Sequence, residues 1–253
     1  MQVRAQGVVV SGGASGLGRA TAQRFAQAGA KVAVLDRNEA LAAEVAREVS
    51  GIAIACDVAD PKSVEAAFAR AVSELGSVRV SVSCAGIGWA GRIVGKEGPH
   101  PFESFAKTIE INLFGTFNLL RFAAAHMSKL EPLETGERGV IVQTASVAAY
   151  DGQIGQAAYA ASKGGVVSMT LPAARELARF GVRVMTIAPG LFATPMMAGL
   201  PPEAQAALAA SVPFPSRLGD PSEYASLALH IAENPMLNGE TIRLDGAIRL
   251  APK

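Results

Sequence analysis

Cysteine and histidine are scarce in this sequence, which has two cysteines and three histidines among 253 residues. Cys56 and Cys84 lie in or beside apolar runs, as is typical of reduced thiols and not of a disulfide framework. The histidines His100, His126 and His230 are scattered, and no metal-ligand spacing is present. We therefore expect neither a bound metal nor a fold held together by disulfides.

An excess of charge of one sign is also lacking, and so are long hydrophobic runs. The 23 basic and 22 acidic residues give a formal net charge of +1, so no extended field would attract nucleic acid or an acidic membrane surface. No apolar run approaches the ~18 residues of a membrane helix, and the first residues lack the basic and apolar segments of a signal peptide. We expect a cytoplasmic protein whose partner is a small-molecule substrate, not nucleic acid or a membrane.

Short apolar runs alternate with helical patterns along the chain. The expected strands cover residues 7–11, 31–36, 52–57, 78–85, 140–145, 182–187 and 241–244. The longer expected helices cover residues 39–49, 61–75, 102–129, 156–180 and 221–232. Parallel strands joined through helices require right-handed crossovers. The pattern predicts an α/β fold: one doubly wound, Rossmann-type domain over residues 1–253, with a seven-stranded parallel sheet covered by helices on both faces.

Two stretches fall outside this alternation, residues 86–101 and residues 191–217. Long excursions after the carboxyl ends of strands build the ligand site of an open α/β sheet. The second stretch is rich in Ala, Met and Pro, so it could close over an apolar substrate as a lid. A packed helical hairpin without such a role is the alternative interpretation.

A glycine-rich turn joins the first expected strand to a helix. Gly12, Gly16 and Gly18 leave an anion free to approach the backbone N–H groups at a helix N-terminus. Asp36 ends the second strand, where its carboxylate can accept hydrogen bonds from the adenosine ribose hydroxyls and repel a 2′-phosphate. We therefore predict NAD as the cofactor, although a guanidinium at Arg37 could hold the phosphate of NADP.

A serine, a tyrosine and a lysine can meet within residues 146–165. Tyr159 and Lys163 are four residues apart in an Ala-rich helical run, so their side chains share one face. A nearby ammonium would lower the pKa of the tyrosine from ~10 toward neutrality. Ser146 ends an apolar run that reads as a buried strand. We predict that Tyr159 exchanges a proton with the substrate, whereas a surface helix pair is the alternative for the Tyr-x-x-x-Lys spacing alone.

Together these motifs resemble the short-chain dehydrogenase/reductase family over essentially the whole chain. The segment Ser11-Gly12-x-x-x-Gly16-x-Gly18 is similar to the family's glycine turn, with Ser in place of Thr. The segment Ser83-Cys84-Ala85-Gly86 is similar to its Asn-Asn-Ala-Gly segment, with Ser and Cys for the two asparagines. The family's catalytic tetrad matches Asn112, Ser146, Tyr159 and Lys163.

The resemblance implies a cofactor site and a substrate site. The cofactor site would comprise Ser11, Gly12, Ser15, Gly16, Leu17, Gly18, Asp36, Asp57, Val58, Cys84, Ala85, Gly86, Tyr159, Lys163, Pro189, Gly190, Phe192 and Thr194. The substrate site would comprise Ser146, Gln153 and Gln156, although turn and cap chemistry is an equal alternative for the two glutamines. Asn112 would hold a water that links Lys163 to solvent. Asp57 could bond the adenine amine or cap a turn.

Longer segments such as TASVAAYDGQIGQAAYAASKGG and LNGETIRLDGAIRL resemble a branch of the family that acts on 3-hydroxyacyl-CoA. The resemblance implies an NAD-dependent oxidoreductase that interconverts 3-hydroxyacyl-CoA and 3-oxoacyl-CoA, and a homotetramer. A hydroxysteroid or other secondary-alcohol dehydrogenase is an alternative with the same tetrad. A non-catalytic binding or scaffold protein is a second alternative.

Overall fold

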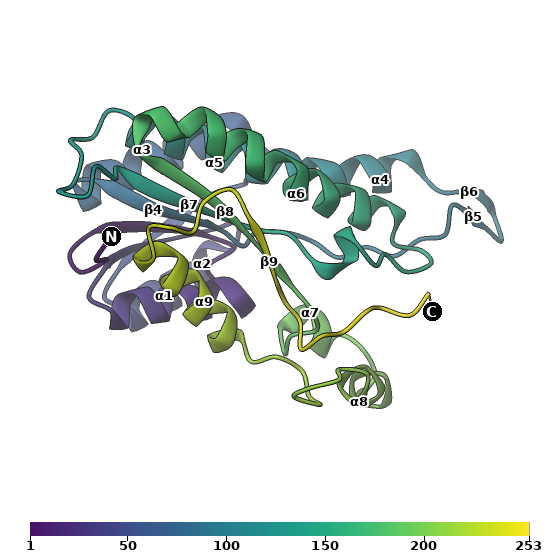
Figure 1. Ribbon diagram of the computed structural model, residues 1–253. Coiled ribbons are helices and arrows are strands. Elements are labelled where there is room, and N and C mark those ends of the chain that lie inside the picture. The colour runs from purple at the N-terminus through teal and green to yellow at the C-terminus, as the bar shows by residue number, and fades with distance from the viewer. Residues whose placement is uncertain (253) are drawn as a thin grey trace.

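The computed structural model describes residues 1–252 and has a seven-stranded parallel sheet at its centre (Figure 1). The strands are β1 (Gly7–Ser11), β2 (Lys31–Asp36), β3 (Ile52–Ala55), β4 (Val78–Ser83), β7 (Gly139–Thr144), β8 (Val182–Pro189) and β9 (Thr241–Leu244). They are ordered β3-β2-β1-β4-β7-β8-β9, so the order reverses direction between β1 and β4. This topology confirms the predicted doubly wound, Rossmann-type α/β fold.

Helices cover both faces of the sheet (Figure 1). One face carries α1 (Gly16–Gln27), α2 (Glu39–Glu48) and α9 (Pro221–Glu233), and the other carries α3 (Pro61–Leu75), α5 (Gly115–Met127) and α6 (Ala157–Leu177). Successive residues of a strand point to opposite faces, so Val8 and Val10 lie in one core and Val9 in the other. Burial on both faces explains why the strands are continuous apolar runs.

Helix starts in this fold carry residues that satisfy the free N–H groups of a first turn. Asn38 accepts a hydrogen bond from Leu41 N at the start of α2, and Asp60 accepts one from Lys62 N at the start of α3. At α9, Asp220 forms a capping box with Glu223. These local signals set where the helices begin and therefore where the intervening strands end.

The predicted helix over residues 102–129 is interrupted. It consists of α4 (Phe102–Ile109), a π-helical turn (Glu110–Phe114) and α5. Asn112 lies inside the π-helical turn, and its carbonyl accepts a hydrogen bond from Thr116 Oγ1. Single π-helical turns within a helix are frequent at functional sites, because the extra residue changes which side chains face the neighbouring elements.

The two excursions contain short elements of their own. Residues 86–101 include a two-stranded hairpin of β5 (Val94–Gly95) and β6 (Gly98–Pro99), and residues 191–217 include α7 (Pro195–Ala198) and α8 (Pro202–Ala210). The predicted third and fourth strands are shorter than expected, because pairing ends at Ala55 and Ser83. Among residues 1–252, no helix combines the length and the hydropathy needed to cross a membrane.

Candidate active site

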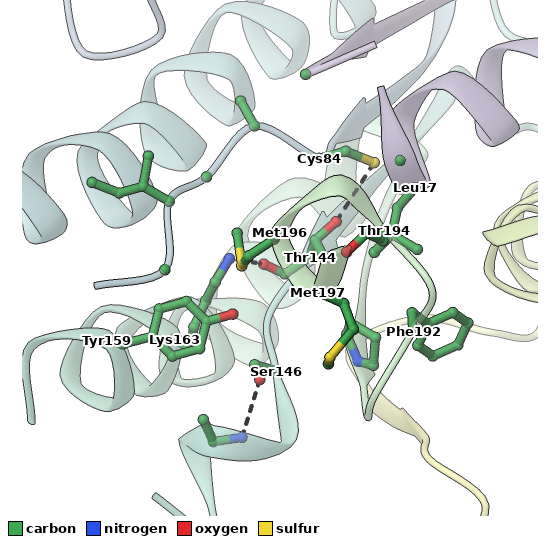
Figure 2. A pocket seen from close by; sticks show the side chains of 18 of the residues that line it. Leu17, Cys84, Thr144, Ser146, Tyr159, Lys163, Phe192, Thr194, Met196 and Met197 are labelled. Carbon is green, nitrogen blue, oxygen red and sulfur yellow. Dashed lines mark hydrogen bonds between the residues drawn. The ribbon is translucent and has the colours of Figure 1, made fainter. Parts of the chain in front are cut away.

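A cleft of about 640 Å³ lies at the carboxyl ends of the strands, beside the glycine turn that follows β1. Every residue predicted to bind cofactor or substrate lines this cleft except Ser11. Of the predicted tetrad, Ser146, Tyr159 and Lys163 line it (Figure 2) and Asn112 lies behind it. Open α/β sheets bind ligands at this edge. The fold therefore brings residues from Gly12 near the start of the chain to Leu250 near its end into one cleft.

The glycine turn packs too closely against its surroundings to accept side chains. A Cβ on Gly12 would lie 2.6 Å from Ala85 N, and one on Gly18 would lie 2.1 Å from the Gly12 carbonyl oxygen. The backbone φ of Gly16 is +51°, a conformation that side chains disfavour. The N-terminus of α1 is thereby held against the cleft with its N–H groups accessible. This geometry fits the pyrophosphate of a dinucleotide cofactor.

The carboxylate of Asp36 is fixed at the end of β2. Its Oδ2 accepts a hydrogen bond from Ala14 N in the glycine turn (3.1 Å), and its Oδ1 accepts one from Asn38 N (2.9 Å). Arg37 lines the same part of the cleft. A carboxylate oriented by two backbone N–H groups retains lone pairs for ribose hydroxyls, so the site fits the adenosine end of the cofactor.

Asp57 lines the cleft and also caps a turn, the second role considered for it from the sequence. Its Oδ1 accepts a hydrogen bond from Ala59 N (3.0 Å), and its own N–H donates to Ser63 Oγ. The side chain therefore caps the turn before α3 while it faces the cleft.

Tyr159 and Lys163 project from α6 into the cleft, but their electrostatics differ from the prediction. Lys163 Nζ donates to the Thr144 carbonyl (2.8 Å) and lies 5.9 Å from the centre of the Tyr159 ring (Figure 2). Burial lowers the pKa of Lys163 to about 8. Burial also raises the pKa of Tyr159, an effect that the Ser146 hydroxyl partly offsets. The prediction that Lys163 lowers the tyrosine pKa is wrong for this structure, because desolvation of the phenolate dominates.

Asn112 serves the packing behind the cleft. Its Oδ1 accepts from Ile87 N (2.8 Å), and its Nδ2 donates to the Ile87 carbonyl (3.0 Å) and to Ser162 Oγ (3.1 Å). A Cβ on Gly86 would lie 3.1 Å from Asn112 Oδ1 and 3.5 Å from Lys163 Nζ. The amide therefore joins the loop after β4 to α6, directly behind the lysine.

The two cysteines are free, and burial raises the pKa of both thiols, that of Cys56 to about 11. Cys84 lies on the floor of the cleft, where its Sγ donates to the Tyr224 hydroxyl (3.7 Å) and accepts from Thr144 Oγ1 (3.8 Å). Thr144 and Tyr224 share a further hydrogen bond of 2.6 Å. The cysteine that replaces the family's asparagine therefore packs in a network of neutral groups. Among residues 1–252, no group of three or more His, Cys, Asp or Glu is arranged to hold a metal.

The residues predicted to bind substrate line the part of the cleft near the start of α6, and several residues of 191–217 line the same cleft. Gln153 N donates to Gln156 Oε1 (3.2 Å), and Gln153 Nε2 donates to the Ala251 carbonyl (2.9 Å). Both glutamines line the cleft. They also stabilise the turn before α6 through their hydrogen bond, the alternative role considered for them from the sequence. The apolar side chains that line the cleft include Met196, Met197, Leu200, Leu208 and Leu250.

Sequence reasoning misses several cleft residues. Thr144 accepts a hydrogen bond from Lys163 through its carbonyl, but the sequence pattern predicts only that it belongs to a strand. Its position at the end of that strand, two residues before Ser146, could have indicated a place in the cleft. Leu250 is missed entirely, and nothing in its local pattern separates it from an ordinary apolar residue. Its place in the cleft depends on contacts between distant segments.

Comparisons with known proteins agree with this geometry. Residues 6–205 match the sequence model of the short chain dehydrogenase family. The chain is 52% identical over 248 residues to the 3-hydroxyacyl-CoA dehydrogenase type-2 of Homo sapiens, covering 96% of this chain and 95% of that protein. It is likewise 52% identical over 248 residues to the protein of the same name from Drosophila melanogaster, covering 96% of this chain and 97% of that one.

Solved structures share the whole fold. A 3-hydroxyacyl-CoA dehydrogenase type-2 from Mycobacterium avium has a TM-score of 0.93 at 45% identity and covers 98% of this chain and 97% of its own. A 3-ketoacyl-(acyl-carrier-protein) reductase from Brucella melitensis, complexed with NADH, has a TM-score of 0.88 at 29% identity, covering 98% of this chain and 100% of its own. Because the family model, the relatives and the solved structures all agree, we conclude that the chain belongs to the short-chain dehydrogenase/reductase family and is an oxidoreductase.

Proposed function

We propose that this oxidoreductase interconverts a 3-hydroxyacyl-CoA and a 3-oxoacyl-CoA with NAD as cofactor, and that residues 191–217 form the lid of its substrate site. The observation that carries the proposal is an apolar cleft end beside Ser146 and Tyr159, lined by methionine and leucine side chains of that lid. Such a surface suits an acyl chain. The relatives named 3-hydroxyacyl-CoA dehydrogenase type-2 support the same substrate class.

The cofactor would be held by the glycine turn at its pyrophosphate and by Asp36 at its adenosine ribose, with Lys163 at the nicotinamide ribose. When bound, NAD accepts a hydride from the alcohol carbon or, as NADH, returns it to the ketone. The residues of this chain would orient the alcohol carbon of the substrate toward the bound cofactor. The glycine turn would fix the middle of the dinucleotide, and residues 191–217, several of which line the cleft, would cover the substrate.

Tyr159 exchanges the proton. Its raised pKa keeps the phenol protonated at neutral pH, so it is prepared to donate to the ketone oxygen during reduction and accepts the same proton back during oxidation. Ser146 holds the substrate oxygen by a hydrogen bond, and its hydroxyl is itself fixed by Ala148 N (3.1 Å). Charge that develops on the substrate oxygen is thereby met by a pre-oriented donor.

The direct test is NADH absorbance with acetoacetyl-CoA as substrate. Consumption of NADH at a rate within the usual enzymatic range, ~1 to 10³ s⁻¹, supports the proposal. Turnover of a 17β-ketosteroid without turnover of acetoacetyl-CoA would replace it with the hydroxysteroid alternative. Absence of turnover with either substrate would favour the binding or scaffold alternative.

NAD is expected to be preferred over NADP, because the oriented Asp36 carboxylate repels a 2′-phosphate. Asp36→Ala should raise KM for NAD by about 10- to 100-fold, as expected for hydrogen bonds to a charged group worth ~1.5–3 kcal/mol. Arg37→Ala is the matched control and should leave KM for NAD nearly unchanged. Steady-state kinetics with both cofactors make the measurement, and an NADP efficiency equal to that of NAD would show that Arg37 dominates.

We also propose a homotetramer. Phe102, Phe114 and Phe117 are exposed along α4, the π-helical turn and α5, and clustered exposed aromatics mark association surfaces. Light scattering at micromolar concentration should give four times the chain mass of 26.0 kDa. Phe117→Glu should shift the mass downward, and a monomeric wild-type protein would contradict the proposal.

A further inference from the structure

The segment that follows β9, residues 245–252, lies against the loop that carries the predicted substrate glutamines. Ile154 N donates to the Pro252 carbonyl (3.0 Å), and Gln153 Nε2 donates to the Ala251 carbonyl (2.9 Å). Between these contacts and β9, Leu250 turns into the cleft. The wall of the substrate end is therefore built from two segments about a hundred residues apart in the chain.

Arg243, near the end of β9, joins these two segments. Its Nη2 donates to Asp151 Oδ2 (2.5 Å), its Nε donates to Asp245 Oδ2 (2.7 Å), and the same Nη2 reaches the Ile248 carbonyl (3.0 Å). The guanidinium also lies 5.2 Å from the centre of the Tyr150 ring, within the range of a cation–π contact. One planar, charged group thus contacts both the loop and the segment.

The ion pair between Arg243 and Asp151 is mostly shielded from solvent, so its two side chains keep a fixed arrangement. The side chains of Arg243 and Asp151 are 20% and 19% exposed, and charge-assisted hydrogen bonds are stronger and shorter than neutral ones. The hydrogen bond from Arg243 lowers the pKa of Asp151, so the aspartate is charged at neutral pH. Arg249 also pairs with Asp245 but is 62% exposed, so its pair is weak.

The other end of the segment contacts the lid. Phe214 N donates to the Gly246 carbonyl (3.2 Å), and a Cβ on Gly246, whose φ is +58°, would lie 2.5 Å from Val212. A Cβ on Gly190 would lie 2.9 Å from Asp245. Figure 1 shows the segment leaving β9 on the side of the molecule that carries α7 and α8. It therefore connects the base of the lid, the end of β8 and the loop before α6.

We propose that Arg243 is a positioning residue for substrate binding: it fixes residues 150–156 and residues 245–252 as one wall and so sets where Gln153 and Leu250 meet the substrate. The inference rests on the proposed function for the identity of the substrate. The hydrogen bonds of Arg243 reach neither the glycine turn nor Asp36, so we expect its main effect at the substrate end.

The first experiment compares Arg243→Met with the matched control Arg249→Met. Arg243→Met should raise KM for acetoacetyl-CoA by about 10- to 100-fold, because the wall formed by Gln153 and Leu250 would contact the substrate equally in the ground state and the transition state. For the same reason kcat should change less than about threefold, and the NADH dissociation constant should change less than about twofold. Arg249→Met should leave all three values nearly unchanged. Equal KM values for the two variants, or a parallel loss of NADH affinity, would overturn the inference.

Asp151→Asn provides a second route if Arg243→Met folds poorly. The amide keeps the shape and removes the charge, so KM should rise in the same direction by a smaller factor. Arg243→Lys keeps the charge but loses the planar fork and should fall between Arg243→Met and wild type. A KM for Asp151→Asn equal to that of wild type would contradict the proposed role of the pair.

Hydrogen exchange tests the same wall without any substrate. In Arg243→Met, amides of both residues 150–156 and residues 245–252 should exchange faster. Arg249→Met should leave exchange in both segments nearly unchanged, because its exposed ion pair is weak. If the wild-type protein fails with acetoacetyl-CoA, the proposed function falls while faster exchange in both segments still supports the inference. Unchanged exchange at residues 150–156 in Arg243→Met overturns the inference even when acetoacetyl-CoA is turned over.

Discussion

Tyr159→Phe is expected to lower kcat with acetoacetyl-CoA and NADH by about 10²- to 10⁴-fold, the usual contribution of a general acid. The substitution removes one oxygen and leaves the ring, so the packing of α6 should survive. Neither neighbour is expected to replace the phenol, because the Ser146 hydroxyl already serves to hold the substrate oxygen and Lys163 Nζ donates to the Thr144 carbonyl. Steady-state kinetics and NADH titration on the purified variant make the measurement.

The pH dependence of the wild-type enzyme gives a second readout of the same group. Because burial raises the pKa of Tyr159, the base form is scarce at neutral pH, and the rate of alcohol oxidation should rise as the pH rises toward that pKa. The acid form is abundant across the neutral range, so ketone reduction should be nearly flat there. Tyr159→Phe should lack the alkaline rise in oxidation.

Lys163→Ala should differ from Tyr159→Phe in kind. It removes the proposed contact to the nicotinamide ribose, so it should weaken NADH binding as well as kcat, whereas Tyr159→Phe should leave the NADH dissociation constant nearly unchanged. A Tyr159→Phe variant that retains more than about a tenth of wild-type activity would show that the tyrosine is not the proton donor, since that loss is below the smallest expected of a general acid.

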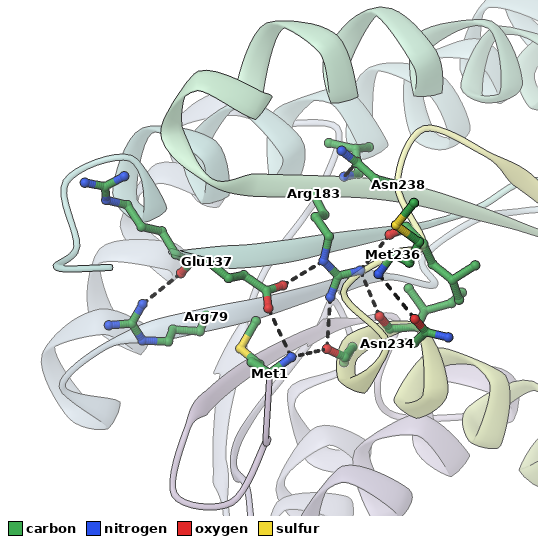
Figure 3. A network of polar contacts seen from close by, with 12 residues as sticks. Met1, Arg79, Glu137, Arg183, Asn234, Met236 and Asn238 are labelled. Carbon is green, nitrogen blue, oxygen red and sulfur yellow. Dashed lines mark hydrogen bonds and ion pairs between the residues drawn. The ribbon is translucent and has the colours of Figure 1, made fainter. Parts of the chain in front are cut away.

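Arg183→Met is expected to destabilise the protein by about 3 kcal/mol, the lower end of the cost of breaking a buried ion pair, because Glu137 keeps a second charged partner, the N-terminal ammonium of Met1 (3.0 Å). Arg183 lies on β8 with its side chain 8% exposed, and its Nε donates to Glu137 Oε1 (2.7 Å). Its other guanidinium nitrogens donate to backbone carbonyls of Ile231, Ala232 and Leu237 (Figure 3). The substitution would remove the donor to Glu137 Oε1 and to the carbonyls of Ile231 and Leu237. Glu137 Oε2 and the Ala232 carbonyl would keep the Met1 ammonium as their donor.

The matched control is Arg19→Met. Arg19 pairs with Glu48 at 2.6 Å, but the two side chains are 46% and 39% exposed, so the loss should stay below about 1 kcal/mol. Urea unfolding at one fixed protein concentration compares the variants, since the proposed assembly would make stability depend on concentration. Equal unfolding midpoints for the two variants would contradict the role assigned to the Arg183 network.

The fold could be predicted from the sequence because its signals are local. Apolar runs such as residues 7–11, with valines that fill both cores, mark strands buried on two faces. The glycines of the turn after β1 mark a backbone that has no room for side chains of its own. Spacing along one helix places Tyr159 and Lys163 on the same face, so the sequence alone suffices to recognise this pair as a candidate for proton transfer.

Electrostatics of the site are decided only by the tertiary structure. Four-residue spacing brings an ammonium near a phenol, but whether it acts on that phenol depends on the depth of the cleft and on competing acceptors. The Thr144 carbonyl accepts the hydrogen bond from Lys163, and burial raises the tyrosine pKa. The position of Asn112 likewise depends on a π-helical turn that the helical periodicity does not reveal.

Long-range contacts mark the limit of what the sequence by itself determined about this protein. The residues between a strand end and the next helix follow from local pattern, which is why the glycine turn, Asp36 and the tyrosine helix could be assigned to the cleft. Arg243 and Leu250 could not be assigned to the cleft from the sequence, because residues 243–252 fold back onto residues 150–156. Asp151 in that loop lies 92 positions before its partner Arg243. Only the packed chain brings such groups together, since no spacing within either segment encodes its partner.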